Sequence, residues 1–433
     1  MNAERTIFHV DVNSAFLSWS ALKKLRDEPG SVDLRTIPSA VGGDVKTRHG
    51  IITAKSIPAK KYGIQTAEPV VKALQKCPQL VLVPPDFQTY QEYSRALMDI
   101  LAQYSSLLQQ VSIDEAYLDM SDRIAPGDRE AAKMWAMRIR EQVKKELGFT
   151  VNVGISTNKL LAKMASDFEK PDRTHTLYPD EVPSKMWPLP IDSLHGCGKS
   201  TAQKLQLIGI NTIGEAAASD PMLLQSILGQ KSGAYIYNSA NGISRSPVVA
   251  EREQAKSISN ERTLSEDINR ENYQTDGIPV IRGLSQKVAS RMQKKGLVGQ
   301  TVTLQVKSSE FERYSRQMSL SEASDRAEEI EEAALLLADR LLNGSDGLFE
   351  AGTAIRLIGV GVSRLTESEK QIHQMDLFEW ADQNLEEEKR KEEKRRAIAE
   401  ENEKRNAKQA RLNKMMETIN NRYGTGTVKK GET

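Results

Sequence analysis

The sequence has few cysteines and few aromatic residues, and it has no long apolar run. Its two cysteines, Cys77 and Cys197, are too few for a disulfide framework or a cysteine-based zinc site. No run approaches the ~18 apolar residues of a membrane helix, and the first apolar stretch, Thr6–Val12, is too short for a signal peptide. We therefore expect a soluble protein of a reducing, cytoplasmic compartment that does not bind membranes.

Neither charge is in excess. The 60 basic residues nearly match the 59 acidic ones, which leaves a net charge of +1. This balance alone indicates no nucleic-acid-binding protein, polybasic membrane protein or acidic tail. Apolar material is sufficient for folded cores, since 39% of the 433 residues are hydrophobic, and a chain of this length predicts about three domains.

The N-terminal region predicts a strand, a helix and an insert. The alternating, β-branched segment Thr6–Val12 predicts a strand, and the residues on one of its faces are Ile7, His9 and Asp11. Asn13 is expected to cap a helix over Ser14–Leu25. Residues 31–85 carry glycines and prolines but no long period, which predicts a small inserted subdomain.

Regular patterning returns after this insert. The expected elements are a helix over residues 90–108, a β-hairpin over Val111–Asp119 with its corner near Asp114 and Glu115, a helix over 128–147, a strand over 150–155 and a helix over 158–168. With the first strand and helix, this order is close to the split βαβ ferredoxin-like arrangement, interrupted by the insert and carrying an extra helix.

The second half of the chain predicts two further units and a tail. Residues 186–250 read as short helices, with a capping box at Thr212–Glu215, and predict a compact all-α unit. Residues 256–365 repeat the order βαββαβ. After Leu365 the composition shifts to Glu, Lys and Arg, which is typical of a solvated helix or a partly disordered tail.

Three carboxylates lie where the predicted sheet can bring them together. Asp11 ends the first strand, and Asp114 and Glu115 lie at the hairpin corner. Carboxylates suit hard cations, and two such ions can activate a hydroxyl and neutralise a leaving pyrophosphate. The backbone carbonyl of Val12 can add a ligand. The alternative is that the acids only suit a turn and a strand end, but bulky apolar neighbours are unusual in a solvated turn.

Five segments carry a resemblance to a known family. They are Phe8–Phe16, Val111–Asp119, Val153–Ala165, Leu189–Lys199 and Lys256–Thr263. In this order they resemble the hallmark segments of bacterial Y-family translesion DNA polymerases, which include the DNA polymerase IV and UmuC-like (ImpB/MucB/SamB) enzymes. The fourth segment looks like the helix-hairpin-helix of the thumb, and the fifth looks like the start of the little finger. The resemblance extends from residue 5 to about residue 365.

The resemblance implies an α+β, multidomain right-hand polymerase with a ferredoxin-like palm and a second βαββαβ domain. Its parts would be the palm at residues 1–12 and 88–183, the fingers at 13–87, the helix-hairpin-helix thumb at 184–249, the little finger at 254–366 and a charged C-terminal tail at 367–433.

The resemblance also assigns roles to single residues. The catalytic, metal-binding acids would be Asp11, Asp114 and Glu115, joined by the carbonyl of Val12, with two Mg²⁺ ions per active site. Glu115 would lie near the primer terminus. The nucleotide-binding residues would be Asn13, Ser14, Ala15, Phe16, Thr53, Lys60 and Lys163. The DNA-binding residues of the thumb would be Gly196, Gly198 and Lys199.

Some of these residues have ordinary alternatives. Phe16 matches an aromatic steric gate that excludes a ribose 2′-hydroxyl, but it also suits a plain apolar helix face. Lys163 and Lys159 could be surface lysines on one helix face, and the two glycines could serve a tight interhelical turn.

The fingers segment departs from the family pattern. Ile57 stands where the family often has Tyr, Lys60 stands where it often has Arg, and one residue is inserted after Thr53. Lysine cannot form the bidentate fork of arginine, so the contacts to the triphosphate are the weakest part of the resemblance.

The segment Gln374–Phe378 resembles the peptide by which bacterial polymerases bind the sliding clamp, the DNA polymerase III β subunit. Met375, Leu377 and Phe378 would be its apolar anchors, and Gln374 would supply hydrogen bonds. The alternative is an amphipathic start to a tail helix.

The function predicted is a DNA-directed DNA polymerase of low fidelity that adds dNTPs to a primer 3′-hydroxyl on damaged or undamaged template DNA, without proofreading. We expect a monomer with roles in DNA repair, the SOS response and mutagenesis. The alternative is a non-catalytic factor that binds DNA and the clamp and has kept the polymerase fold. Because no predicted domain has more than about two charges in excess, we expect weak, distributive DNA binding.

Overall fold

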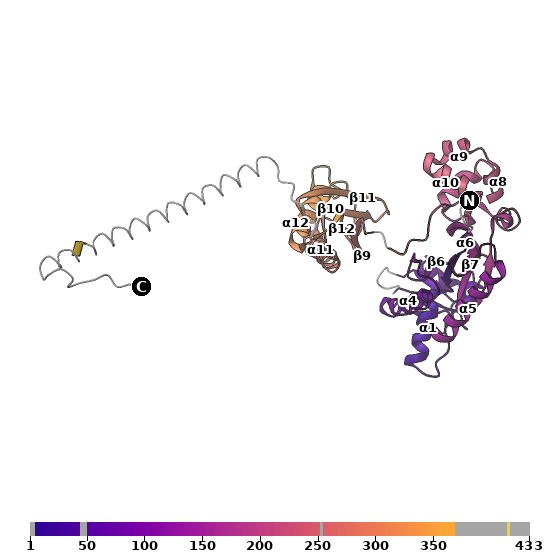
Figure 1. The fold of residues 1–433 in the computed structure, drawn as a ribbon. Coiled ribbons are helices and arrows are strands. Elements are labelled where there is room, and N and C mark those ends of the chain that lie inside the picture. Colours follow the sequence, from indigo (N-terminus) through magenta and orange to yellow (C-terminus); the bar gives the residue numbers. More distant parts are fainter. Residues whose placement is uncertain (1–4, 44–49, 252–253, 369–413, 416–433) are drawn as a thin grey trace, which may run out of the picture.

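The N-terminal part of the molecule is built around a five-stranded sheet. The structure, a computed structural model, describes residues 5–43, 50–251, 254–368 and 414–415 (Figure 1). The order of the strands in this sheet is β5 (Leu108–Gln110), β6 (Glu115–Asp119), β1 (Ile7–Val12), β7 (Val151–Ser156) and β8 (Thr174–Thr176). All neighbours are antiparallel except β7 and β8, which are parallel.

The two faces of this sheet carry different helices. One face packs on α1 (Ala15–Asp27), α4 (Phe87–Ala102) and α5 (Arg129–Leu147), through a core that includes Phe8, Val10 and Val12 of β1. The other face carries α6 (Lys159–Ser166), where Ala162 contacts Ile7. Because successive strand residues point to opposite faces, His9 and Asp11 also face α6, as predicted.

Several local expectations differ from the structure. The helix expected over 90–108 begins at Phe87 and ends at Ala102, because Leu108–Gln110 pairs with β6 as a short strand. Asn13 does not cap α1; the N-cap residue is Ser14, in a left-handed conformation with φ 48°. The side chain of Asn13 instead bonds to Asn152, to Thr150 and to the backbone of Asp172.

The insert between α1 and α4 contains a second sheet. Its strands are β3 (Ile52–Lys55), β2 (Ser39–Gly42) and β4 (Val81–Val83) in that order, with helices α2 (Ile57–Lys60) and α3 (Val70–Lys76). Val41 and Ala54 pack with Leu17 and Ala21 of α1. The insert is therefore held directly against the helix that follows β1.

A helical unit follows the first sheet. It comprises short turns at Pro179–Glu181, Val182–Met186 and Ile191–Ser193, and helices α7 (Lys199–Gln206), α8 (Ile213–Ala218), α9 (Pro221–Leu228) and α10 (Gln230–Ala240). The predicted all-α unit and the capping box between Thr212 and Glu215 are confirmed. Leu160, Leu161 and Met164 of α6 belong to its core, so α6 joins this unit to the sheet.

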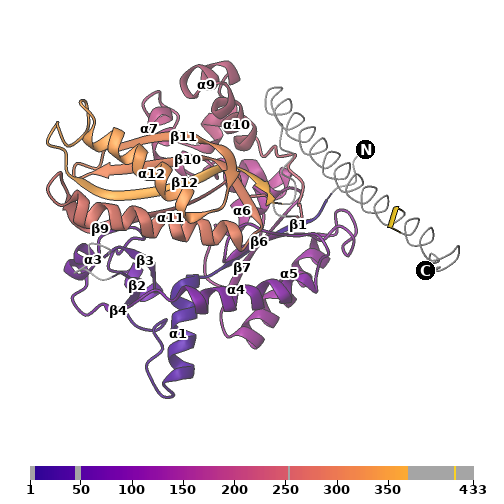
Figure 2. The same ribbon diagram turned by 90° about the vertical axis from the view of Figure 1, so that its left-hand side faces the viewer.

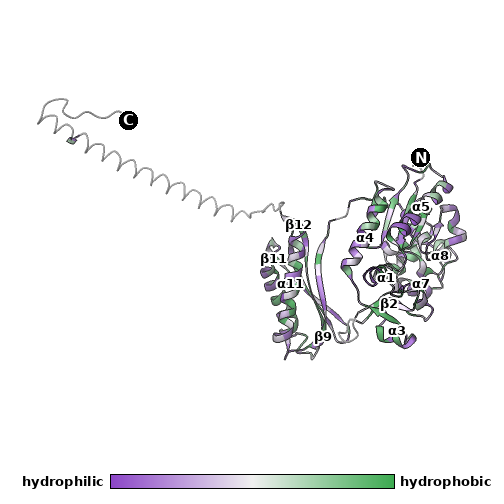
Figure 3. Cartoon of the chain, turned by 90° about the horizontal axis from the view of Figure 1, so that it is seen from below, coloured by the Kyte–Doolittle hydropathy of each residue, from purple (hydrophilic) through white to green (hydrophobic). Residues whose placement is uncertain are grey.

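The last unit repeats the predicted βαββαβ order. Its elements are β9 (Ser257–Ile268), a turn at Tyr273–Gly277, α11 (Ile278–Gln293), β10 (Leu297–Ser308), β11 (Arg313–Ser324), α12 (Ala327–Ala338), a turn at Asp339–Asn343 and β12 (Ile355–Glu367). The strands form one antiparallel sheet in the order β11-β10-β12-β9, and α11 and α12 lie side by side on it (Figure 2). Figure 3 shows hydrophobic and hydrophilic residues alternating around the helices, as expected for helices with one buried face.

The chain between α10 and β9 is attached to the first sheet by a segment that we call the linker strap, residues 247–249. Val248 is buried in a cluster with Ile7, Tyr117 and Ala162. The ammonium group of Lys159 donates to the carbonyl of Pro247 (3.2 Å) and to Oε1 of Gln109 (2.8 Å). The same Gln109 oxygen accepts a hydrogen bond from the backbone of Val249 (3.2 Å). Both the backbone and one side chain of the strap are therefore fixed to the first sheet.

Among the helices in the described parts of the chain, none is both long and apolar enough to cross a membrane.

Candidate active site

The three predicted acids meet at the end of β1. The antiparallel register pairs Asp11 with Glu115, which is the first residue of β6. The backbone N–H of Val12 donates to the carbonyl of Asp114 at 3.0 Å, which ties the preceding loop to β1. The sequence predicted this convergence, although the loop of the hairpin comprises residues 111–114 and Glu115 lies already in the strand.

Two lysines neutralise the acids. Nζ of Lys163 lies 3.0 Å from Oδ2 of Asp11 and 3.0 Å from Oε2 of Glu115. Nζ of Lys170 lies 3.3 Å from Oδ2 of Asp11 and 2.9 Å from Oδ1 of Asp167. Lys163 belongs to α6, and its ammonium group thus lies between the carboxylate of Asp11 on β1 and that of Glu115 on β6.

The surroundings shift the pKa values of Asp114 and Glu115 in opposite directions. Burial raises the pKa of Asp114, and the negative charges of Asp11 and Glu115 add to this effect, although Oδ1 accepts a hydrogen bond from Ser112 (2.6 Å). The contact with His9, followed by that with Lys163, lowers the pKa of Glu115 to about 2. Asp114 is therefore a largely buried acid next to two others, and within the described residues no ion pair joins it to a cation as Lys163 joins Asp11 and Glu115.

This donor set fits a hard divalent cation. One ligand atom each of His9, Asp11 and Glu115 lies within 4.8 Å of the others, and Asp114 adds a carboxylate from the adjoining loop. The raised pKa of Asp114 indicates crowded negative charge, which a cation with a preference for carboxylate oxygens would relieve. Mg²⁺ is such a cation, and Asp11, Asp114 and Glu115 are the residues that would hold it.

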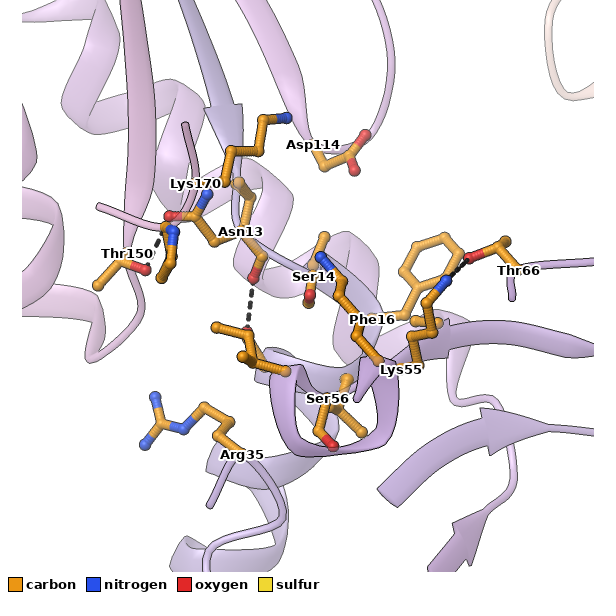
Figure 4. Close-up of a pocket in the computed structure, with 18 of the residues that line it drawn as sticks. Asn13, Ser14, Phe16, Arg35, Lys55, Ser56, Thr66, Asp114, Thr150 and Lys170 are labelled. Atoms are coloured by element: carbon orange, nitrogen blue, oxygen red, sulfur yellow. Dashed lines mark hydrogen bonds between the residues drawn. The ribbon is translucent and has the colours of Figure 1, made fainter. Parts of the chain in front are cut away.

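A cavity of about 480 Å³ opens beside Asp11 and Asp114 (Figure 4). The predicted site residues that line it are Asp11, Val12, Asn13, Ser14, Ala15, Phe16, Thr53, Lys60 and Asp114. Glu115 and Lys163 are not part of its lining, because they lie behind Asp11 on the α6 side of β1. The β1–α1 turn and the inserted subdomain therefore form the walls, and the acids form one edge.

Phe16 is held firmly at this cavity. Its ring is stacked on Tyr90 of α4, with centroids 4.6 Å apart and planes 10° from parallel, and the edge of Phe87 approaches it at 6.2 Å. The side chain is half-buried, so one part of the ring remains at the cavity. This placement fits the predicted steric gate and also explains the apolar character of the position.

The cavity contains three cationic side chains that sequence reasoning missed. They are Arg35, Lys55 and Lys170, which join Lys60. Burial, and then the charge of Lys60, lowers the pKa of Lys55, whose ammonium donates to Thr66 (3.2 Å; Figure 4). Lys55 lies on β3, five residues before Lys60, so its strand position was the available signal. Arg35 and Lys170 lie in loops without a local pattern.

The predicted DNA-binding glycines lie in the helical unit. Gly198 is the N-cap of α7 and Lys199 is its first residue. Gly196 has φ +86°, and a Cβ at this position would lie 2.5 Å from the ring of Tyr235, so no other residue fits there without movement. These residues do not line the cavity. The predicted clamp-binding segment, residues 374–378, lies outside the described residues.

The fold identifies a class of proteins. A solved Y-family DNA polymerase chimera has the same fold, with a TM-score of 0.70 over 83% of this chain and 98% of the chimera. Since the two sequences are only 23% identical, this comparison shows the α+β, multidomain polymerase fold alone. The predicted fold class is thereby confirmed.

Sequence comparisons identify the family. The impB/mucB/samB family matches residues 10–167, its C-terminal domain matches residues 255–377, and the helix-hairpin-helix motif of the family matches residues 179–210. A DNA polymerase IV of Clostridium acetobutylicum is 41% identical over 83% of this chain and 87% of its own length. DNA polymerase IV 1 of Bacillus subtilis is 36% identical over 99% of this chain and 93% of its own length. The chain belongs to the impB/mucB/samB family, which confirms the resemblance.

Proposed function

We propose that this protein adds deoxynucleotides to a primer 3′-hydroxyl opposite a DNA template, as a polymerase of the translesion type. The relatives carry the name DNA polymerase, which confirms the predicted class of enzyme, a DNA-directed DNA polymerase. The observation that carries the proposal is that Asp11 and Asp114 line a cavity together with four cationic side chains, while Glu115 is paired with Asp11 behind it.

Each part of the site has a task in this reaction. Arg35, Lys55, Lys60 and Lys170 provide the positive charge that a triphosphate requires. Asp11, Asp114 and Glu115 would hold Mg²⁺, and that ion would lower the pKa of the attacking hydroxyl and neutralise the leaving pyrophosphate. The ring of Phe16, fixed by Tyr90, would meet the sugar and exclude a 2′-hydroxyl. Lys163 is within reach of both acids and can turn to a phosphate when a cation replaces it.

The proposal includes low fidelity and no proofreading. In the described residues of the insert, 31–43 and 50–85, there are three short strands and two short helices, and Ala15, next to the gate, is small. A small insert checks the shape of a nascent base pair over little surface. We therefore propose that damaged templates are tolerated, with the palm, fingers, thumb and little finger assigned as in the sequence analysis.

Primer extension tests the enzyme. Wild-type protein with Mg²⁺ and dNTPs should extend a primer on undamaged and on abasic templates, and Asp114→Ala should abolish extension while DNA binding in a gel shift remains. Glu141→Ala, an exposed acid on α5 outside the site, is the matched control and should retain activity. A wild type that binds DNA but adds no nucleotide would instead favour the non-catalytic, clamp-binding alternative.

We also propose that the segment Gln374–Phe378 binds the sliding clamp, and that the protein is a cytoplasmic monomer. Deletion of the segment should leave distributive synthesis intact but abolish stimulation by added clamp. Replacing Gln374, Met375, Leu377 and Phe378 by alanine should have the same effect. Unchanged stimulation in either variant would refute this assignment.

A further inference from the structure

We infer that His9, held by Ser166, is a positioning residue whose Nε2 atom orients the catalytic carboxylate of Glu115. The inference rests on the proposed function, because Glu115 is one of the acids assigned to nucleotidyl transfer. His9 is not part of the lining of the described cavity, and it lies two residues before Asp11 on the same face of β1.

The geometry places the ring between two polar partners. Nδ1 of His9 lies 2.8 Å from Oγ of Ser166, and Nε2 lies 3.2 Å from Oε2 of Glu115. The residue is 0% exposed, and Nε2 makes no hydrogen bond of ordinary geometry within the described residues; the contact that it does make is the close approach to the Glu115 carboxylate. The ring of Tyr117, opposite His9 in the β1–β6 pairing, lies against it with centroids 4.7 Å apart.

The contact with Glu115 requires a proton on Nε2. If Nδ1 carried the only proton, it would donate to Ser166, whose hydroxyl donates to the carbonyl of Lys163 (2.8 Å), and the lone pair of Nε2 would face a carboxylate. Two negative ends 3.2 Å apart in a buried site repel each other strongly. With a proton on Nε2, the ring presents a positive end to Glu115. In the neutral ring this needs rotation of the Ser166 hydroxyl toward Nδ1, which takes that donor away from the Lys163 carbonyl.

Glu115 has two partners, His9 and Lys163, and His9 is the more rigid of the two. Lys163 approaches the same oxygen on a flexible four-carbon stem and is shared with Asp11. The imidazole is held by Ser166 on one side and packed against Tyr117 on the other. When Lys163 turns away, His9 is the contact that continues to fix the orientation of the Glu115 carboxylate.

Kinetics of two His9 variants test the role. His9→Leu removes the donor and should lower kcat about tenfold or more, with the KM for dNTP and the Kd for primer–template within about twofold of wild type. His9→Gln retains a donor near Nε2 and should recover most of the loss. His175→Leu, which removes a histidine from β8, is the matched control and should leave kcat unchanged. An unchanged kcat in His9→Leu would overturn the inference. Changes in kcat and KM that are as large in His9→Gln as in His9→Leu would also overturn it.

Nitrogen-15 NMR of the histidine rings in the metal-free protein provides a readout that does not require activity. The resonances of His9 are those lost in His9→Gln. In wild type we expect a proton on Nε2. In Ser166→Ala, Nδ1 loses its hydroxyl partner, so we expect the resonance of Nδ1 to shift. An Nε2 without a proton in wild type would overturn the inference. Absence of primer extension by wild type would refute the proposed function, whereas the NMR result would still decide the contact.

Discussion

Asp114 and Glu115 are adjacent in the chain, but the fold treats their charges in opposite ways. The raised pKa of Asp114 means that its neutral form is favoured in the folded state. The contribution of this side chain to the stability of the fold is therefore complete below the pKa that it has in the unfolded chain, and it is lost as pH rises through its pKa in the folded protein. Glu115 has a pKa of about 2, so its contribution is present above its unfolded pKa and is lost as pH falls through about 2.

This difference predicts opposite effects on stability. In EDTA at pH 7, Asp114→Asn should raise the Tm and Glu115→Gln should lower it, each by roughly 2–4 °C, which corresponds to about 1 kcal/mol after allowance for solvent screening. The Asp114→Asn difference should shrink as pH falls through the raised folded pKa of Asp114 toward about 4, and the Glu115→Gln difference should shrink as pH falls from about 4 toward about 2. Thermal unfolding from pH 3 to 7 measures this, and shifts of the same sign for both variants would contradict it.

Phe16 should determine the choice of sugar. Phe16→Ala removes the ring that stacks on Tyr90 at the cavity, so the incorporation of ribonucleotides relative to deoxynucleotides should rise by about tenfold or more. Phe87→Ala removes a neighbouring ring that does not line the cavity, and it should leave the ratio near that of wild type. Single-nucleotide incorporation with both sugars measures the ratio, and equal discrimination by Phe16→Ala and wild type would refute the gate.

At the scale of residues, the sequence predicted where the acids of the site meet, but it did not predict the hydrogen-bond partners of Asn13. The resemblance and the strand pattern placed Asp11 with Asp114 and Glu115. The cap assigned to Asn13 was wrong because its side chain bonds to Asn152, Thr150 and Asp172, which lie more than 130 residues away. A local cap signal contains no information about such partners.

At the scale of elements, the distance between α6 and β7 determines how Lys163 and His9 meet their partners. A Cβ on Gly154 of β7 would lie 2.0 Å from the carbonyl oxygen of Ala162 and 2.4 Å from the backbone nitrogen of Ser166. Both of these atoms belong to the backbone of α6, so no side-chain rotation can relieve the overlap. The helix can lie this close only because residue 154 is glycine.

Gly154→Ala should therefore displace α6. We expect a loss of about 1–3 kcal/mol in the free energy of unfolding and a fall in kcat, because Lys163 and Ser166 move with the helix. Gly283→Ala is the matched control: Gly283 lies within α11 with nothing within 4 Å of the added carbon, so this change should stabilise by roughly 0.5–1 kcal/mol. Chemical denaturation and primer extension measure both. A fully active, stable Gly154→Ala variant would contradict the close packing.

Long, periodic elements were predicted well and short ones were not. The helix over Arg129–Leu147 and the βαββαβ order of the last unit follow from clear apolar patterns. Strands β5 and β8 have three residues each, and they exist because β6 and β7 provide hydrogen-bonding edges for them. Three residues carry no measurable period, so the sequence could not reveal these strands.

At the scale of the whole molecule, the linker strap connects units whose cores are separate. The core of the last unit contains residues between Ile258 and Val362 and shares none with the core of the first sheet. The strap, fixed by Val248 and by Lys159, therefore sets the point at which the chain leaves the first sheet toward β9.

Loosening the strap should weaken DNA binding without preventing chemistry. Val248→Asp places a charge in the cluster with Ile7 and Tyr117, so the Kd for primer–template should rise by about tenfold, since burial of a valine is worth ~1.5–3 kcal/mol and only part of it bears on binding. kcat at saturating DNA should change less than about threefold. Val249→Asp, at an exposed neighbouring position, is the control. Equal Kd values for both variants would show that the strap does not affect binding.

The overall organisation was predictable, but the composition of the cavity was not. The four cationic residues that line it come from a loop after α1, from β3, from α2 and from the loop before β8. Only the folded chain brings such distant segments together. The net charge of +1 describes the whole sequence and therefore gives no sign of the positive charge gathered at this cavity. The small sheet of the insert was equally hidden, since its strands have three or four residues.

The ion pairs of Lys163 and Lys170 with Asp11 have a consequence for the order in which substrates arrive. At rest, the protein supplies counter-ions from its own side chains, so a lone divalent cation must compete with two tethered ammonium groups. A nucleotide that arrives with its cation brings phosphates that accept those same ammonium groups. In the proposed function, the lysines would turn to the phosphates and leave Asp11 free for the cation, so we expect cation and nucleotide to enter most favourably as one complex.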